Sequence, residues 1–358
     1  MKILLIRLRL IGDVVFTTPI LRALKRAFPA ARLTYIVERE AEPVVRGNPH
    51  LHELIVVPRT RGARRLLDDV RLARRLRAER FDIVIDLHGG PRSSWLTRAT
   101  GARQRIGYNV EGRSWLYTRV VHRARELRPR HSVENQWDLL EAIEGWRQTP
   151  PDRAADAVEM AADPEVVARV EQRLSALDIG DEHELMVVHV SAGNPFRRWP
   201  EPAFVRLVRS LAETSDRRRI VLSSGPSDRE AADRIASAAR AELGTGRADR
   251  IVNFGEFDLA ELRALVVRSR LFVGGDTGPL HVAATTKTPI VGIFGPTLSA
   301  RSAPWRDPAV PTEAVEHADL PCRPCEQRIC TPGDFRCLTT LMPEDVISAA
   351  ERALGRSA

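Results

Sequence analysis

Short apolar runs alternate with longer amphipathic stretches along most of the chain. Apolar runs of about four to eight residues are typical of strands that are buried on both faces of a parallel sheet. Amphipathic stretches between them indicate repeated strand–loop–helix units and a doubly wound α/β fold. The predicted strands cover residues 2–7, 33–37, 53–57, 82–86, 185–190, 219–223, 271–275 and 289–294.

The chain is predicted to divide into two domains at a single junction. A polar, proline-bearing stretch at residues 148–164 separates the two sets of strands and indicates a domain junction. We therefore predict two Rossmann-like domains, residues 1–170 and 171–340, followed by a helical segment at 341–358. The predicted helices cover residues 14–28 (with Pro19 inside), 66–79, 202–214 and 343–354, and one more begins near Asp228.

Composition supports this division. The chain has 358 residues, 43% of them hydrophobic, which suits two domains with substantial cores. No run approaches the roughly 18 apolar residues of a membrane-spanning helix. Arg7 and Arg9 interrupt the apolar N-terminus too early for the core of a signal peptide. We expect a cytoplasmic protein.

The net charge of +8 comes almost entirely from arginine, which is concentrated at residues 59–65 and 71–80. Such faces are either simply solvated or attracted to an anionic surface, such as lipid headgroups, and we allow a peripheral position on a membrane. Basic residues interleaved with aromatic ones, as in nucleic-acid modules, are not found, so nucleic acid is not an expected partner.

The first candidate site is the loop after the first predicted strand, which ends in Gly12-Asp13. It lacks the full Gly-x-Gly-x-x-Gly pattern, so a dinucleotide fingerprint is not indicated. Asp13 has two interpretations: a helix N-cap, or a general base that takes a proton from an attacking hydroxyl.

The second candidate is the loop Gly274-Gly275-Asp276-Thr277-Gly278, directly after an apolar strand. Glycines allow the backbone to approach a ligand closely, and amides of Thr277 and Gly278 are suited to a phosphate. Asp276 is a candidate acceptor for sugar hydroxyls or a helix cap. His281, one helical turn further on, either faces the same site or packs in the core.

Two further strand ends carry candidate ligands. Residues 189–200 combine small polar residues, including Ser191, with a cationic pair, Arg197 and Arg198. An arginine here would neutralise a diphosphate leaving group, unless the pair is an ordinary surface feature beside Trp199. In the other loop, Asp228 either binds ribose hydroxyls or caps the helix that follows.

Together these motifs resemble glycosyltransferase family 9, the heptosyltransferases of lipopolysaccharide core synthesis. The similarity is carried, in the family's order, by residues 2–13, 17–19, 81–89, 105–108, 189–200, 275–281 and 294–297. It implies a GT-B fold, in which two Rossmann-like domains face each other across a cleft. The N-terminal domain would bind the acceptor and the C-terminal domain the donor, while the last helix would pack back on the N-terminal domain.

The resemblance also implies an activity: inverting transfer of heptose from ADP-heptose to a glycolipid acceptor, either Kdo–lipid A or an inner-core heptose, without a cofactor. Asp13 matches the family's catalytic base. Arg197 stands where the family usually has Lys. On this pattern the donor side comprises Ser191, Arg197, Asp228, Asp276, Thr277, Gly278 and His281, and the acceptor side Arg7, Arg9, Gly12 and His88. We expect a monomer.

All four cysteines lie within sixteen residues, as Cys322, Cys325, Cys330 and Cys337. The spacing C-x2-C-x4-C-x6-C is compatible with a structural zinc site or an Fe–S cluster. Reduced thiols and disulfides are the alternatives.

Two other functions remain open from the sequence. One is a GT-B sugar-nucleotide epimerase, which would act without an acceptor. The other is a non-catalytic protein that binds an anionic surface through its arginine-rich faces, and its binding would weaken steeply with salt.

Overall fold

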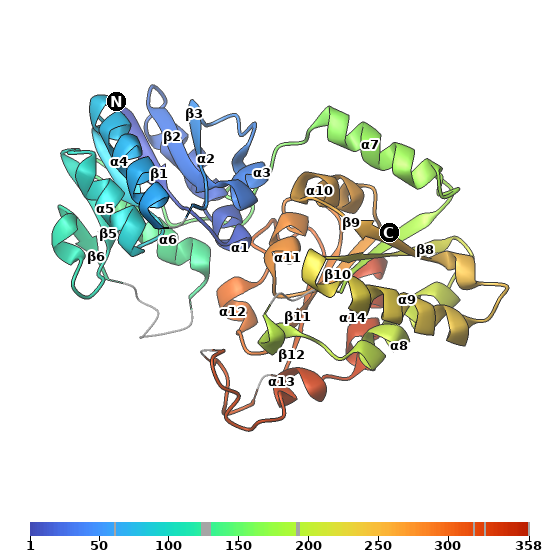
Figure 1. The fold of residues 1–358 in the computed structure, drawn as a ribbon. Helices are drawn as coiled ribbons and strands as arrows, with labels where there is room; N and C mark the ends of the chain where they lie inside the picture. The colour runs from blue at the N-terminus through green and yellow to red at the C-terminus, as the bar shows by residue number, and fades with distance from the viewer. Residues whose placement is uncertain (61, 123–129, 191–193, 318, 326, 357–358) are drawn as a thin grey trace. The chain divides into compact units, whose positions relative to one another are not determined.

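The computed structural model describes the chain except for residues 61, 123–129, 191–193, 318, 326 and 357–358 (Figure 1). The chain divides into two compact units, residues 1–161 (unit 1) and 162–358 (unit 2). The boundary precedes the first helix of unit 2, α7 (Pro164–Ser175), whereas the sequence placed it after residue 170. Among the described residues, no helix has the length and apolar character needed to cross a bilayer.

Unit 1 is built on a six-stranded sheet in which every neighbouring pair of strands is parallel. Its strands are β1 (Lys2–Ile6), β2 (Arg32–Glu38), β3 (Glu53–Val57), β4 (Ile83–Asp86), β5 (Gln104–Tyr108) and β6 (Arg119–Val121). Its helices are α1 (Ile11–Val15), α2 (Thr18–Ala27), α3 (Glu42–Val45), α4 (Gly62–Ala78), α5 (Pro91–Ala99) and α6 (Ser132–Glu141).

Unit 2 repeats this plan with a second six-stranded parallel sheet. Its strands are β7 (Glu184–His189), β8 (Arg218–Ser224), β9 (Ile251–Glu256), β10 (Leu271–Gly275), β11 (Ile290–Phe294) and β12 (Thr312–Glu316). Besides α7, its helices are α8 (Glu201–Glu213), α9 (Arg229–Leu243), α10 (Leu259–Val267), α11 (Gly278–Ala283), α12 (Ser299–Ser302), α13 (Arg336–Thr339) and α14 (Pro343–Gly355).

The strand order fixes where a ligand can bind in each unit. The orders are β3-β2-β1-β4-β5-β6 and β9-β8-β7-β10-β11-β12. The order in which the chain adds strands therefore reverses between β1 and β4 in unit 1, and between β7 and β10 in unit 2. Ligands of doubly wound sheets bind beyond the carboxyl ends of the strands at this switch point. The relevant loops therefore follow β1 and β4 in unit 1, and β7 and β10 in unit 2. The predicted fold class is confirmed.

The prediction of a single helix over residues 14–28 is wrong, because this part of the chain forms two helices. α1 begins at Ile11 and ends at Val15, and α2 begins at Thr18. Proline lacks an amide hydrogen and is tolerated only in the first turn of a helix, so Pro19 starts a new helix instead of continuing the first. Because α1 begins at Ile11, Asp13 lies inside the first turn of this helix.

The final helix, α14, packs on the second sheet. The buried face of α14 (Val346, Ala349, Ala350 and Ala353) belongs to the hydrophobic core of unit 2. There α14 packs against α8 and against strands β10 to β12 (Figure 1). The small apolar side chains of α14 let this helix lie close to the second sheet. The expected packing of residues 341–358 on the N-terminal domain stays a prediction.

Candidate functional site

At the switch point of unit 1, a buried arginine holds the candidate base. Arg7 follows β1 directly and is 7% exposed. Its guanidinium donates to the carbonyl of Leu87, just beyond β4, and forms an ion pair with the Asp13 carboxylate. The side chain of Asp13 nevertheless keeps 30% exposure. The carboxylate is therefore fixed in direction and remains open to a ligand.

The interpretation of Asp13 as a helix cap is wrong. The N-cap of α1 is Leu10, and no side chain makes a capping hydrogen bond there. Leu10 has a φ of 68°, in the left-handed region that non-glycine residues rarely adopt. Strained backbone of this kind clusters at functional sites. Gly12 is half-buried and Arg9 is exposed beside this turn.

The β4–α5 loop of unit 1 is organised by Asp86, which the sequence analysis did not single out. One carboxylate oxygen accepts hydrogen bonds from the amides of His88 (3.0 Å) and Gly89 (2.9 Å). The other accepts from the hydroxyls of Ser93 (3.0 Å) and Tyr117 (2.6 Å). Burial raises the pKa of Asp86, and these four hydrogen bonds oppose that rise. The network fixes the loop that carries His88.

In unit 2, the candidate donor loop is centred on a buried charge cluster. Asp276 follows β10 and is 3% exposed. Its carboxylate lies 3.2 Å from Arg197 Nη1 and 3.4 Å from His281 Nε2. Burial alone would raise the pKa of Asp276, but His281 and Arg197 hold it below its usual value. The structure thus brings together three of the predicted donor residues, and His281 faces the site.

The remaining predicted donor residues surround this cluster or another strand end. Thr277 is the N-cap of α11 without a side-chain capping bond, and Gly278 begins the helix. Asp228, beyond β8, is buried and pairs with Arg198 at 3.2 Å; it is the N-cap of α9 but makes no capping hydrogen bond through its side chain. Ser191 lies outside the described residues.

His189 ends β7 and is buried, with Nδ1 2.9 Å from Ser223 Oγ. Burial lowers the pKa of His189 to about 4. In the unfolded chain this histidine has its ordinary pKa of 6.5, so between pH 6.5 and about 4 the unfolded chain binds a proton that the folded chain does not. The free energy of unfolding should therefore fall as the pH drops through this range. We expect His189 to lower the free energy of unfolding by roughly 3 kcal/mol.

Urea unfolding at several pH values between 4.5 and 7.5 measures this effect. His189→Gln removes the titrating group, so its free energy of unfolding should approach that of the wild type as the pH falls. Parallel curves for the two proteins would show that His189 is not the source of the acid sensitivity.

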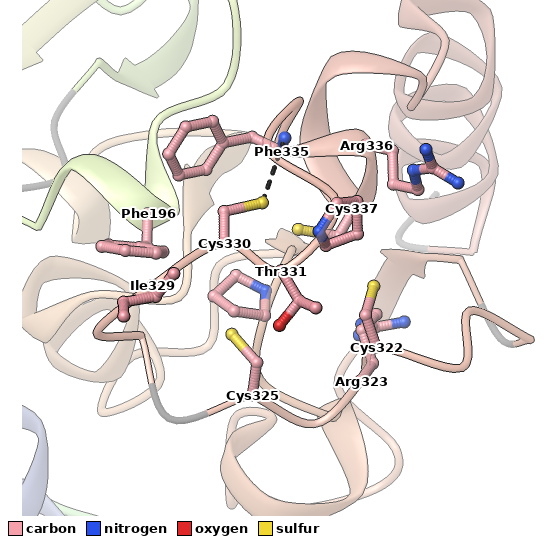
Figure 2. A pocket seen from close by; sticks show the side chains of 12 residues that line it. Phe196, Cys322, Arg323, Cys325, Ile329, Cys330, Thr331, Phe335, Arg336 and Cys337 are labelled. Carbon is pink, nitrogen blue, oxygen red and sulfur yellow. Dashed lines mark hydrogen bonds between the residues drawn. The ribbon is translucent and has the colours of Figure 1, made fainter.

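The cysteine-bearing segment, residues 320–337, surrounds a small pocket in unit 2. All four cysteines line it, together with Phe196 and Phe335 (Figure 2). All four thiols are free, and Cys330 Sγ accepts a hydrogen bond from the amide of Phe335 (3.4 Å). Burial raises the pKa of the Cys337 thiol.

The fit of this segment to a metal is poor. Within the part of the chain that the structure describes, no three His, Cys, Asp or Glu side chains are grouped closely enough to hold a metal ion. The predicted zinc or Fe–S site at Cys322, Cys325, Cys330 and Cys337 is therefore unsupported.

Two doubly wound units, each with charged side chains at its switch point, are typical of GT-B glycosyltransferases. The sequence model of glycosyltransferase family 9 (heptosyltransferase) matches residues 70–333. The chain therefore belongs to glycosyltransferase family 9, and the predicted family and enzyme class are confirmed. The epimerase and the non-catalytic binding protein find no support in this match.

Individual relatives agree with the family. Lipopolysaccharide heptosyltransferase 3 of Escherichia coli K12 is 26% identical, over 97% of this chain and 96% of its own length. A family 9 glycosyltransferase from Veillonella parvula has a TM-score of 0.81 at 23% identity, covering 99% of this chain and 97% of that one. ADP-heptose LPS heptosyltransferase II of E. coli has a TM-score of 0.77 at 19% identity, covering 100% and 99%. These two structures support the fold.

Proposed function

We propose that this enzyme transfers heptose from ADP-heptose to a lipopolysaccharide core acceptor with inversion at the anomeric carbon. The acceptor is Kdo–lipid A or an inner-core heptose. The names of the relatives support the donor and the acceptor class. The observation that carries the proposal is the Asp13 carboxylate, which Arg7 holds at the switch point of unit 1 while 30% of its side chain stays exposed.

Asp13 acts as the general base. It takes the proton of an acceptor hydroxyl while that oxygen attacks the anomeric carbon. The bond from this carbon to the ADP oxygen breaks, and ADP leaves with the electron pair. Arg7 directs the carboxylate, and Arg9, Gly12 and His88 contribute to the acceptor side.

The donor loop of unit 2 stabilises the departing ADP. Arg197 supplies positive charge to the diphosphate, and the amides of Thr277 and Gly278 supply hydrogen bonds. Asp276, held by Arg197 and His281, accepts from sugar hydroxyls. Asp228 lies near the ribose of the nucleotide. Because Arg197 provides the charge that the leaving group needs, the proposed reaction uses no metal or cofactor.

The surface of unit 1 supports a peripheral position on the cytoplasmic face of the inner membrane, where the glycolipid acceptor would be met. On α4, Leu66 and Leu67 are 66% and 58% exposed and follow the exposed Arg64 and Arg65. Apolar side chains beside arginines suit an anionic lipid surface. We propose a monomer that works in this position.

A thermal-shift panel of ADP-, UDP- and GDP-sugars tests the donor class. We expect ADP-heptose to raise the melting temperature by several degrees at about a hundredfold excess over its Kd, and the UDP- and GDP-sugars to leave it unchanged. ADP release that depends on added acceptor would then separate transfer from epimerisation. Indifference to every ADP compound would refute the proposal.

A further inference from the structure

The cysteine-bearing segment reaches the donor loop through the side chain of Gln327. Its carbonyl oxygen Oε1 accepts hydrogen bonds from Arg197 Nε and Asn194 Nδ2, both at 2.8 Å. Its amide nitrogen Nε2 lies 3.4 Å from Thr297 Oγ1, just beyond β11. Gln327 therefore joins the loop after β7 to the loop after β11, and it contacts the cation proposed for the diphosphate.

The backbone at Gln327 is held in an unfavourable conformation. Its φ is 59°, in the left-handed region that favours glycine. A non-glycine residue persists there when its surroundings over-determine the conformation. The side-chain contacts of Gln327 offer a reason for a glutamine at this position.

The segment on both sides of Gln327 is anchored to the same loops. On one side, Arg323 donates to the carbonyl of Thr297 (2.8 Å) and pairs with Glu316 (2.6 Å). On the other side, the Phe335 ring meets Phe196 edge-on, with centroids 5.2 Å apart (Figure 2). Phe196 directly precedes Arg197, so the segment braces the turn that carries the cation.

Arg197 has a second fixed contact. Its Nη1 donates to the backbone carbonyl of Asp276 (2.5 Å) and lies 3.2 Å from the carboxylate. With Nε held by Gln327 and Nη1 by Asp276, the plane of the guanidinium is set from two directions. A planar cation oriented in advance binds a diphosphate better than one that must be ordered on binding.

We propose that Gln327 is the positioning residue for Arg197, and that the cysteine-bearing segment is the structural element that presents it. This inference rests on the proposed function, because that function assigns Arg197 to the donor diphosphate. Through this contact, a segment outside the predicted donor motifs sets the affinity for the nucleotide.

Calorimetric titration of ADP into the full-length enzyme tests the inference with two variants. Gln327→Met removes the acceptor oxygen at similar size, and Gln327→Gly removes the side chain while suiting the left-handed backbone. We expect both to weaken ADP binding roughly tenfold and to leave the KM for the acceptor unchanged. Gln327→Gly should fold at least as well as Gln327→Met, so a loss of ADP affinity in it cannot come from backbone strain.

The matched control is Gln104→Met in unit 1. Gln104 Oε1 also accepts a hydrogen bond, in this case from the backbone amide of Glu144 at 3.0 Å. This variant should bind ADP like the wild type. In a double-mutant cycle, adding Gln327→Met to Arg197→Met should cause little further loss, since both changes act on one contact.

Three outcomes are decisive. Coupled losses in the cycle support the inference. Wild-type ADP affinity in both Gln327 variants, with a weakened Arg197→Met, would overturn the positioning role alone. Wild-type affinity in Arg197→Met would instead refute the donor assignment of Arg197 and the inference with it.

Discussion

Asp13→Asn should turn over about a hundredfold to ten-thousandfold more slowly than the wild type, because the amide cannot accept the proton of the attacking hydroxyl. Donor binding should persist, since the proposed donor contacts lie in unit 2. The exchange keeps the size of the side chain. Initial rates of ADP release at saturating donor and acceptor, with ADP affinity from calorimetry, measure both quantities.

The control for this experiment is Asp138→Asn. Asp138 is also paired with an arginine, Arg130, at 2.7 Å, and its side chain is 18% exposed. Its loss removes a comparable ion pair away from the switch point, so turnover should stay near the wild-type level. Near wild-type turnover in Asp13→Asn would show that another group is the base, while an equal loss in both variants would point to general destabilisation.

The periodicity of the sequence was enough to predict which candidate loops lie at the switch points of the two sheets. Apolar runs locate the strands. Charged and polar residues directly after such a run therefore lie at the carboxyl edge of the parallel sheet. Arg7, Asp13 and Asp276 were found in this way, and the structure places them at the two switch points. For residues next to strand ends, position in the sequence almost determines position in space.

Residues that act through distant contacts could not be predicted from local patterns. The side chains of Gln327 and Arg197 meet across 130 positions of the chain, and no periodicity encodes that pair. Asp86 offered a weak signal, a carboxylate at the end of an otherwise apolar strand, but its Tyr117 partner is 31 residues away. The spacing of the four cysteines is a related case, since it says nothing of how closely the sulfurs converge.

Arg197→Met should lower turnover about a hundredfold to a thousandfold and weaken ADP binding, because the departing diphosphate loses its main cation. The change also leaves the buried Asp276 carboxylate with His281 as its remaining neighbour among the contacts described. Some loss of stability is therefore expected, and kinetics should be measured well below the melting temperature of the variant. Arg234→Met is the control, since it breaks an exposed pair with Glu201 on the same unit.

Arg197→Lys separates charge from geometry at this position. Lysine restores the positive charge but offers a single ammonium group in place of a planar fork, so it cannot satisfy Gln327 and Asp276 in the same way. We expect it to recover most of the turnover lost in Arg197→Met and to bind ADP more weakly than the wild type. Full recovery of both would mean that charge alone matters and orientation does not. No recovery at all would mean that Arg197 serves the fold of the loop, and the diphosphate would need another cation.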